Sequence, residues 1–155
     1  MSQNRIYIGI DPGSNGAIAI IIDDVVYKVV KYDSYEISNI IKELVFNYSK
    51  DHTMMCTLEK VHSMPRDGVK QAFKFGENYG FVKGTLMALQ IPFQEVTPMT
   101  WKKEYSLVKQ DKSVSIKRCK ELFPGISLLP SSRCTKESDG MAEALLICEY
   151  GRRHF

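Results

Sequence analysis

Two apolar runs separated by a tight turn, in the stretch Ile6–Ile22 (IYIGIDPGSNGAIAIII), constrain the fold of this chain most strongly. The first run ends on Asp11, and a turn rich in Pro, Gly, Ser and Asn leads directly into the second run. Apolar β-forming runs joined in this way predict a hairpin. Runs this apolar are typical of central strands that are covered on both faces. The stretch therefore predicts a buried hairpin with an acid at one edge of the sheet.

Length and composition limit what the rest of the chain can be. Its 155 residues, 44% apolar and 25% charged, predict one domain over residues 1–155 with a proper core. No apolar run approaches the ~18 residues of a membrane span, and the N-terminal MSQNR lacks the apolar segment of a signal peptide. We therefore expect a cytoplasmic protein that does not enter membranes. The four scattered cysteines predict free thiols, and the net charge of +3 does not by itself indicate a nucleic-acid partner.

Strand-like and helix-like segments alternate after the hairpin. Further strands are predicted at Val25–Tyr32, Thr53–Glu59 and Ile91–Val96. Helices are predicted at Ser34–Lys50, about Val69–Leu89, from Pro98, from Asp111 to about Phe123, and at Met141–Arg152, with Pro124–Lys136 as a loop. We place Trp101, the only tryptophan, in the core rather than on a surface that stacks on bases. Three antiparallel strands followed by this alternation predict a mixed α/β sheet covered by helices.

Four acids occupy positions from which they can meet. Asp11 and Glu59 each end a predicted buried strand. Asp139 opens the last helix and Glu143 follows one turn later, on the same helix face. If the two strands are neighbours, four carboxylates converge and repel one another, and a divalent cation relieves that repulsion. Oxygen ligands favour Mg²⁺ or Mn²⁺, and two such ions about 3.5–4 Å apart support cleavage of a phosphodiester bond.

Each acid also has a simpler explanation. Asp11 can cap the turn that follows it, and Glu59 can be a solvated strand end. Acids in the first turn of a helix are favoured by capping and by the helix dipole, which accounts for Asp139 and Glu143. Spacing alone does not choose between these explanations and a shared metal site.

Five segments, in the order IGIDPGSNGA, LEKVHSMP, GVKQAFKFGENYGFVKGTLMAL, VTPMTWKK and SDGMAEALLI, resemble RuvC-type Holliday-junction resolvases, and most closely the small bacteriophage branch. The resemblance implies an RNase H-like fold of the α/β class, with a mixed five-stranded sheet whose first three strands are antiparallel. It implies a homodimeric crossover junction endodeoxyribonuclease that uses two Mg²⁺ ions per site, with Mn²⁺ as a substitute. It assigns catalysis and metal binding to Asp11, Glu59, Asp139 and Glu143.

The chain departs from cellular members of this family at two places. Their last two acids are separated by two residues, whereas three residues separate Asp139 from Glu143, so the matching of these two acids stays open. Cellular members also carry an aromatic residue three places after the acid of the fourth strand, where it stacks on bases near the crossover. That place holds His62. An imidazole stacks on bases more weakly than a larger aromatic ring, so we expect little preference for the DNA sequence that is cut. The alternative is that His62 is a solvated loop histidine.

A glycine repeat and a set of cations complete the candidate residues. Gly76, Gly80 and Gly84 share one helix face and each costs ~1 kcal/mol of helix stability, so another backbone is expected to approach there. It belongs either to a second protomer, as the resemblance favours, or to the protein's own sheet. Side chains expected to contact DNA, mainly its phosphates, are His62, Arg66, Lys70, Lys74, Lys102, Lys103, Lys109, Lys112, Lys117 and Arg118. The alternative for any single cation is a solvated charged face.

These observations favour a structure-selective endonuclease that resolves or debranches four-way junctions, three-way junctions and forks. If the protein is of phage origin, its location would be the cytosol of the bacterial host. Two alternatives stay open. One is an actin-like ATPase or sugar kinase, because Asp-x-Gly-Ser after a first strand also occurs in phosphate-binding hairpins. The other is a branched-DNA-binding protein without catalytic activity.

Overall fold

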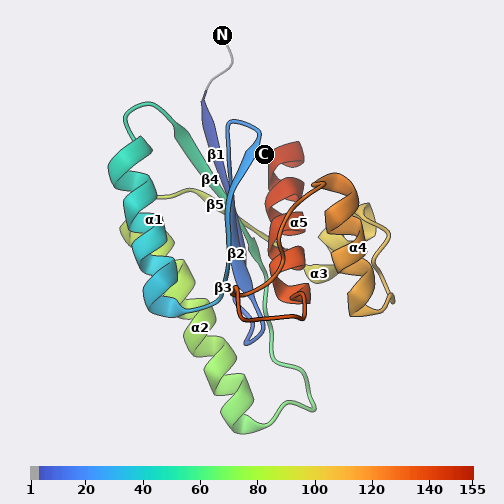
Figure 1. Cartoon of the computed structure of the whole chain (residues 1–155). Helices are drawn as coiled ribbons and strands as arrows, with labels where there is room; N and C mark the ends of the chain where they lie inside the picture. Colours follow the sequence, from blue (N-terminus) through green and yellow to red (C-terminus); the bar gives the residue numbers. More distant parts are fainter. Residues whose placement is uncertain (1–3) are drawn as a thin grey trace.

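The computed structural model describes residues 4–155, and its centre is one five-stranded sheet (Figure 1). The first three residues of the MSQNR segment, which was predicted not to be a signal peptide, lie outside these residues. The strand order is β3-β2-β1-β4-β5. The first three strands are antiparallel, and β4 and β5 run parallel to β1. Their bounds are β1 Arg5–Asp11, β2 Ala17–Ile22, β3 Val25–Lys31, β4 Thr53–Glu59 and β5 Phe93–Val96. The predicted fold class is confirmed.

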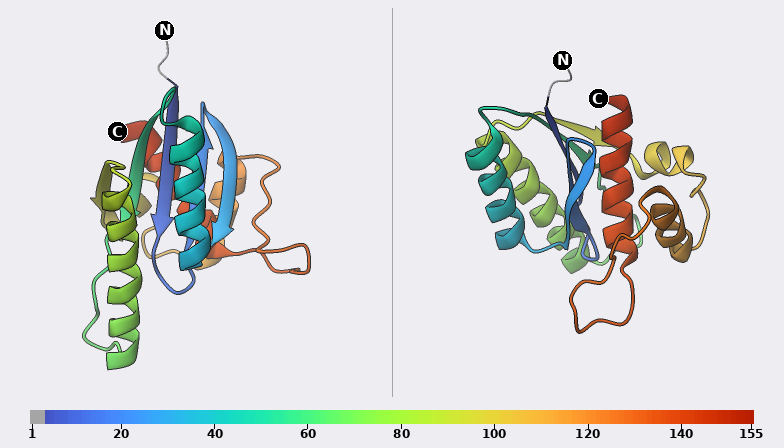
Figure 2. Two further views of the ribbon diagram at one scale, coloured as in Figure 1. Left: turned by 90° about the vertical axis from the view of Figure 1, so that its left-hand side faces the viewer. Right: turned by 45° about the horizontal axis from the view of Figure 1, so that its top comes forward.

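Helices cover both faces of the sheet (Figures 1 and 2). One face carries α1 (Ser34–Tyr48) and α2 (Val69–Ala88). The other face carries α5 (Asp139–His154), with α3 (Pro98–Glu104) and α4 (Lys112–Leu122) packed outside it. Among the helices of residues 4–155, none combines the length and the apolar character that a membrane crossing requires.

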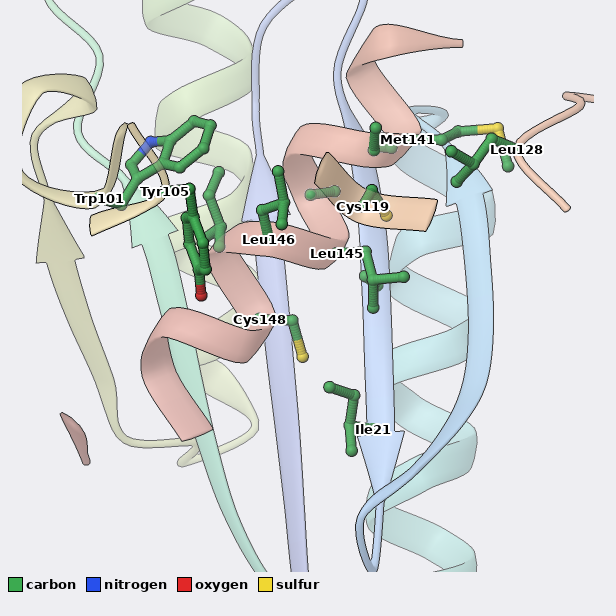
Figure 3. Close-up of a cluster of buried hydrophobic side chains, with 14 of the residues drawn as sticks. Ile21, Trp101, Tyr105, Cys119, Leu128, Met141, Leu145, Leu146 and Cys148 are labelled. Carbon is green, nitrogen blue, oxygen red and sulfur yellow. The ribbon is translucent and has the colours of Figure 1, made fainter. Parts of the chain in front are cut away.

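Successive side chains along each strand point to opposite faces of the sheet, so the core has two layers. Ile6, Ile8 and Ile10 of β1 are completely buried under α1 and α2. The opposite face packs against α5, and Figure 3 shows this second cluster, in which Leu145 and Leu146 of α5 lie with Trp101 and Ile21. The two layers explain why the first strands are apolar at nearly every position.

A glycine in β1 brings α5 close to the sheet. A β-carbon at Gly9 would collide with the backbone of Cys148. Because Gly9 has no side chain, the helix axis lies nearer to β1 than any larger residue would permit. This close packing sets the distance between the start of α5 and the end of β1, where the acids lie.

Four element boundaries differ from the prediction by two residues: α1 ends at Tyr48 rather than Lys50, α5 ends at His154 rather than Arg152, and the starts of the last helix and the last strand also differ. The last helix begins at Asp139, as the placement of the acids assumed, rather than at Met141, as the apolar pattern indicated, because the Ser138 hydroxyl caps it by accepting a hydrogen bond from the Met141 N–H at 3.2 Å. The last strand begins at Phe93 rather than Ile91, since Pro92 has no N–H to donate to a ladder. Trp101 lies in the core as predicted, with none of its surface exposed.

The glycine face of α2 points away from the rest of the chain. A β-carbon at Gly76, Gly80 or Gly84 would meet no atom within 4 Å. The alternative that these glycines pack onto the protein's own sheet is therefore wrong. Helical spacing places the exposed side chains of Val69, Phe73 and Met87 on this same face. This surface, Val69, Phe73, Gly76, Gly80, Gly84 and Met87, is called the glycine face below.

Candidate active site

Asp11 and Glu59 lie side by side because their strands are neighbours. The parallel pair β1 and β4 aligns Ile10 with Leu58, and each acid is the next residue of its strand. Both strands leave the buried sheet at this point, so each carboxylate is only partly exposed. The condition that the two strands be neighbours is therefore met, and their pairing brings the two acids to one edge of the sheet.

The start of α5 brings the other two acids to the same edge. A β-carbon at Gly140 would collide with the carbonyl oxygen of Asn15, so the first turn of α5 sits directly on the turn between β1 and β2. Asp11, Asp139 and Glu143 together line a cleft of about 170 Å³, whose other walls include Lys112 and Phe75. Glu59 lines the adjoining cleft together with Asp11, so the four predicted acids lie at one edge of the sheet, with Asp139 more exposed than Glu143.

Burial and mutual repulsion disfavour the charged forms of these acids. Burial, assisted by the charge of Asp11, raises the pKa of Glu59 to about 8. Burial also raises the pKa of Asp11, against the effects of the Gly13 N–H and of two lysines, and the charge of Asp139 raises it further. The pKa of Glu143 is raised by burial as well, with Lys102 opposing the shift. A cation placed among these carboxylates would lower all three pKa values.

Each deeper carboxylate is held by a donor from a different element. The Gly13 N–H donates to Oδ1 of Asp11 at 3.0 Å, so Asp11 caps its turn as well as lining the cleft. The indole Nε1–H of Trp101 donates to Oε2 of Glu59 at 2.7 Å. The Ser115 hydroxyl of α4 donates to Oε1 of Glu143 at 3.3 Å. These bonds fix one oxygen of each acid and leave the second oxygen available.

The bond from Trp101 to Glu59 was missed by sequence reasoning. The two residues are 42 positions apart, and no spacing relates the end of β4 to the first turns of α3. Trp101 is buried as predicted, but its one polar atom contacts a carboxylate of the site rather than the core. A buried tryptophan N–H needs an acceptor, which is the only signal the sequence contained.

Lysines supply the positive charge of the site. Nζ of Lys102 lies 3.7 Å from Oε1 of Glu143, and Nζ of Lys112 lies 3.7 Å from Oδ2 of Asp139. Lys31, which the sequence analysis did not select, lowers the pKa of Asp11 and donates to the Asn15 carbonyl oxygen at 3.1 Å. Within residues 4–155, no three acidic, histidine or cysteine side chains are grouped closely enough to enclose a metal ion. A lysine ammonium is instead the cation beside Glu143.

The remaining predicted DNA contacts fall into two groups, those that pair with an acid and those that do not. Lys74 pairs with Glu77 at 3.7 Å and Arg118 with Glu121 at 2.7 Å, so these two cations are partly neutralised. The other cations are exposed and make no ion pair within residues 4–155; they are Arg66, Lys70, Lys103, Lys109 and Lys117.

A second cleft adjoins the acids on the β4 side. Its volume is about 380 Å³, and its walls include Glu59, the exposed His62, Met64, Phe75 and Pro98. Phe75 of α2 lines both clefts, so its ring stands between them beside Asp11. His62 thus lies next to the acids, on a surface that is more apolar than the acidic cleft.

The comparisons with known proteins define the class of fold. No protein-family model matches this sequence, and no curated protein sequence matches it. Among solved structures, the chain is similar to Thermus thermophilus RuvC in complex with a Holliday junction substrate, with a TM-score of 0.60 and 16% sequence identity over 97% of this chain and 96% of that one. It is equally similar to a second structure of T. thermophilus RuvC, with a TM-score of 0.60 and 17% identity over 96% of each chain. The protein therefore has the RNase H-like fold of RuvC over nearly its whole length.

Proposed function

We propose that this protein is a structure-selective endodeoxyribonuclease that resolves or debranches four-way junctions and other branched DNA. The observation that carries the proposal is the convergence of Asp11, Glu59, Asp139 and Glu143 at one edge of an RNase H-like sheet, where burial and repulsion raise the pKa of three of them. Buried carboxylates that repel one another destabilise the fold, so a purely structural role does not explain why they are grouped here. The likeness to RuvC, whose solved complex contains a Holliday junction, supports branched DNA as the substrate.

The donor set suits a hard divalent cation. All four candidate ligands are carboxylates, which favour Mg²⁺ or Mn²⁺ over softer metals. When bound, two such ions would activate a water and stabilise the leaving oxygen of the phosphodiester. The residues that would hold them are Asp11, Glu59, Asp139 and Glu143.

The chain's own residues position the substrate and the acids. Gly13, Trp101 and Ser115 each hold one carboxylate by a hydrogen bond, so the acids are oriented before DNA arrives. Lys112 and Lys31 lie at the same edge, where they would attract the phosphate backbone toward the cleft. Phe75 and His62 form a surface beside Glu59 that a base exposed at a crossover can cover.

A homodimer completes the proposed activity. Two symmetric cuts in a four-way junction require two active sites related by a two-fold axis. The glycine face is exposed and combines small with apolar side chains, which allows two helices to approach closely. We propose that residues 1–155 act as one nuclease domain and that two copies associate through this face. The phage branch and the cytoplasmic location remain part of the same proposal.

One experiment tests the activity directly. Labelled four-way, three-way, forked and linear DNA is incubated with the protein, with and without Mg²⁺. We expect Mg²⁺-dependent cutting of the branched molecules, and we expect Asp11→Asn to abolish cutting while junction binding persists. Asp51→Asn, at an exposed position between α1 and β4, is the matched control and should cut normally. Cutting by Asp11→Asn at the wild-type rate would remove Asp11 from the active site.

The same assay determines which of the last two acids, Asp139 or Glu143, is essential for cutting. Asp139→Asn and Glu143→Gln are compared at several Mg²⁺ concentrations. Glu143 is more buried, and burial and the charge of Asp11 raise its pKa, whereas Asp139 is one-third exposed and pairs with Lys112. We therefore expect the larger loss of cutting from Glu143→Gln. A larger loss from Asp139→Asn would assign the essential position to the first turn of α5.

A further inference from the structure

A loop that leads into α5 projects from the body of the molecule beside the acids (Figure 2). It comprises residues 129–137 and is closed at its base, where the Ser138 N–H donates to the Leu128 carbonyl oxygen at 2.8 Å. Leu128 is completely buried, so the base is anchored in the core. A turn at the tip, from Ser131 to Cys134, gives the loop internal structure. Compact loops with adjacent ends and their own contacts are frequently functional.

The outer part of this loop is positively charged. Arg133 and Lys136 are exposed and make no ion pair with any residue from 4 to 155. The loop's only acid, Glu137, is at the base and pairs with Lys120 of α4 at 2.7 Å. Ser131 and Ser132 before Arg133, and Thr135 between the two cations, add exposed hydroxyl groups. The projecting surface therefore offers cations and hydroxyls, which are the side chains that contact phosphates.

The loop lies directly before the acidic cleft in the sequence. Its last residue is followed by Ser138, which caps α5, and then by Asp139 of the cleft. Lys112, which pairs with Asp139, and Lys31, which acts on Asp11, lie at the same edge. The His62 cleft opens instead toward the loop between β4 and α2. The cations of the projecting loop thus flank the acids on the side away from His62.

We propose that residues 130–136 bind the phosphate backbone of one duplex arm of the branched DNA, next to the strand that is cut. This inference rests on the proposed function and adds to it a specific contact surface. No large apolar side chain of the loop is exposed, which disfavours a membrane or a protein partner as its main ligand. The surface reads no bases, so its contribution is to affinity and orientation. Because the loop projects from the body of the protein, it would favour DNA that has a duplex arm on this side of the crossover.

A pair of matched double variants tests the contact by binding alone. Arg133→Ala with Lys136→Ala removes two loop cations, and Lys42→Ala with Lys50→Ala removes two exposed cations from α1 and the turn after it. Binding to a four-way junction is measured in EDTA over a series of salt concentrations. We expect the loop variant to bind at least about tenfold more weakly near 0.1 M salt and to lose about 1.8 from the log–log salt slope. The α1 variant is expected to retain both values, and a loop variant with the wild-type slope would overturn the proposal.

A second measurement locates the loop on the DNA. Cys134 lies between the two cations and is only partly buried, whereas Cys56, Cys119 and Cys148 are fully buried. A thiol-reactive iron chelate can therefore be attached at Cys134, with Cys134→Ser as the unlabelled control. We expect radical cleavage of an end-labelled junction to be confined to one duplex arm within a few nucleotides of the crossover. Cleavage spread evenly over all arms, or none above the control, would contradict the assigned contact.

These outcomes separate the two proposals. If the wild type binds and cuts branched DNA but the loop variant is unaffected, only the loop assignment fails. If the wild type neither binds nor cuts branched DNA, the proposed function fails and the loop assignment fails with it.

Discussion

Replacing Glu59 by glutamine is expected to stabilise the metal-free protein at alkaline pH while abolishing cutting. Burial raises the pKa of Glu59 from 4.5 to about 8, so the folded protein binds this proton more tightly than the unfolded chain. The free energy of unfolding therefore falls as the pH rises from about 4.5, and the loss is complete once the pH exceeds about 8. Glutamine keeps an acceptor for the Trp101 N–H but carries no charge, so it avoids this loss.

The magnitude follows from the size of the pKa shift. The rise in the pKa of Glu59 from 4.5 to about 8 corresponds to at most about 5 kcal/mol, at about 1.36 kcal/mol for each pKa unit. We expect about 2 kcal/mol, because Glu59 lies at an open cleft where water and the nearby Lys102 can reduce the cost of its charge. The variant should therefore match the wild type at pH 5 and exceed its stability by ~2 kcal/mol at pH 9.

Urea unfolding in EDTA at pH 5, 7 and 9 measures this difference, with the fluorescence of the single tryptophan as the signal. Glu43→Gln, at an exposed position of α1, is the control and should show no gain that depends on pH. Adding Mg²⁺ at ten times its Kd should stabilise the wild type by roughly 1.4 kcal/mol and the variant by less. A variant less stable than the wild type at pH 9, or a difference independent of pH, would refute the reasoning.

Three further predictions concern positioning, assembly and specificity. Trp101→Phe keeps most of the buried ring but removes the donor to Glu59, so Mn²⁺ affinity measured by electron paramagnetic resonance should fall several-fold; unchanged affinity would show that the bond does not orient Glu59. Gly80→Leu should weaken dimerisation in sedimentation experiments, and a wild type that is monomeric at micromolar concentration would contradict the two-site mechanism. His62→Phe should narrow the choice of cleavage sites on mobile junctions more than it changes affinity, whereas tight cutting at one short consensus by the wild type would refute a shape-selective enzyme.

The order of elements and the identity of the acids could be predicted from the sequence. Short apolar runs such as Ile6–Ile10 have the length and the β-forming composition of buried strands, and helix starts are marked locally by residues such as Thr97 and Asp111. Asp11 and Glu59 were recognisable because each terminates a run that must be buried. These signals are local, because hydrogen-bonded turns and caps involve residues only a few positions apart.

The geometry of the site was decided by tertiary structure alone. Gly9 and Gly140 bring α5 against β1 and the following turn, and only this contact places Glu143 beside Asp11. The bond from Trp101 to Glu59 and the pairing of Lys102 with Glu143 join elements that are distant in sequence. Helical spacing showed that the glycines of α2 share a face, but not whether that face is covered by the sheet. Such facts depend on how rigid elements pack in three dimensions, and packing has no periodic signature in a single sequence.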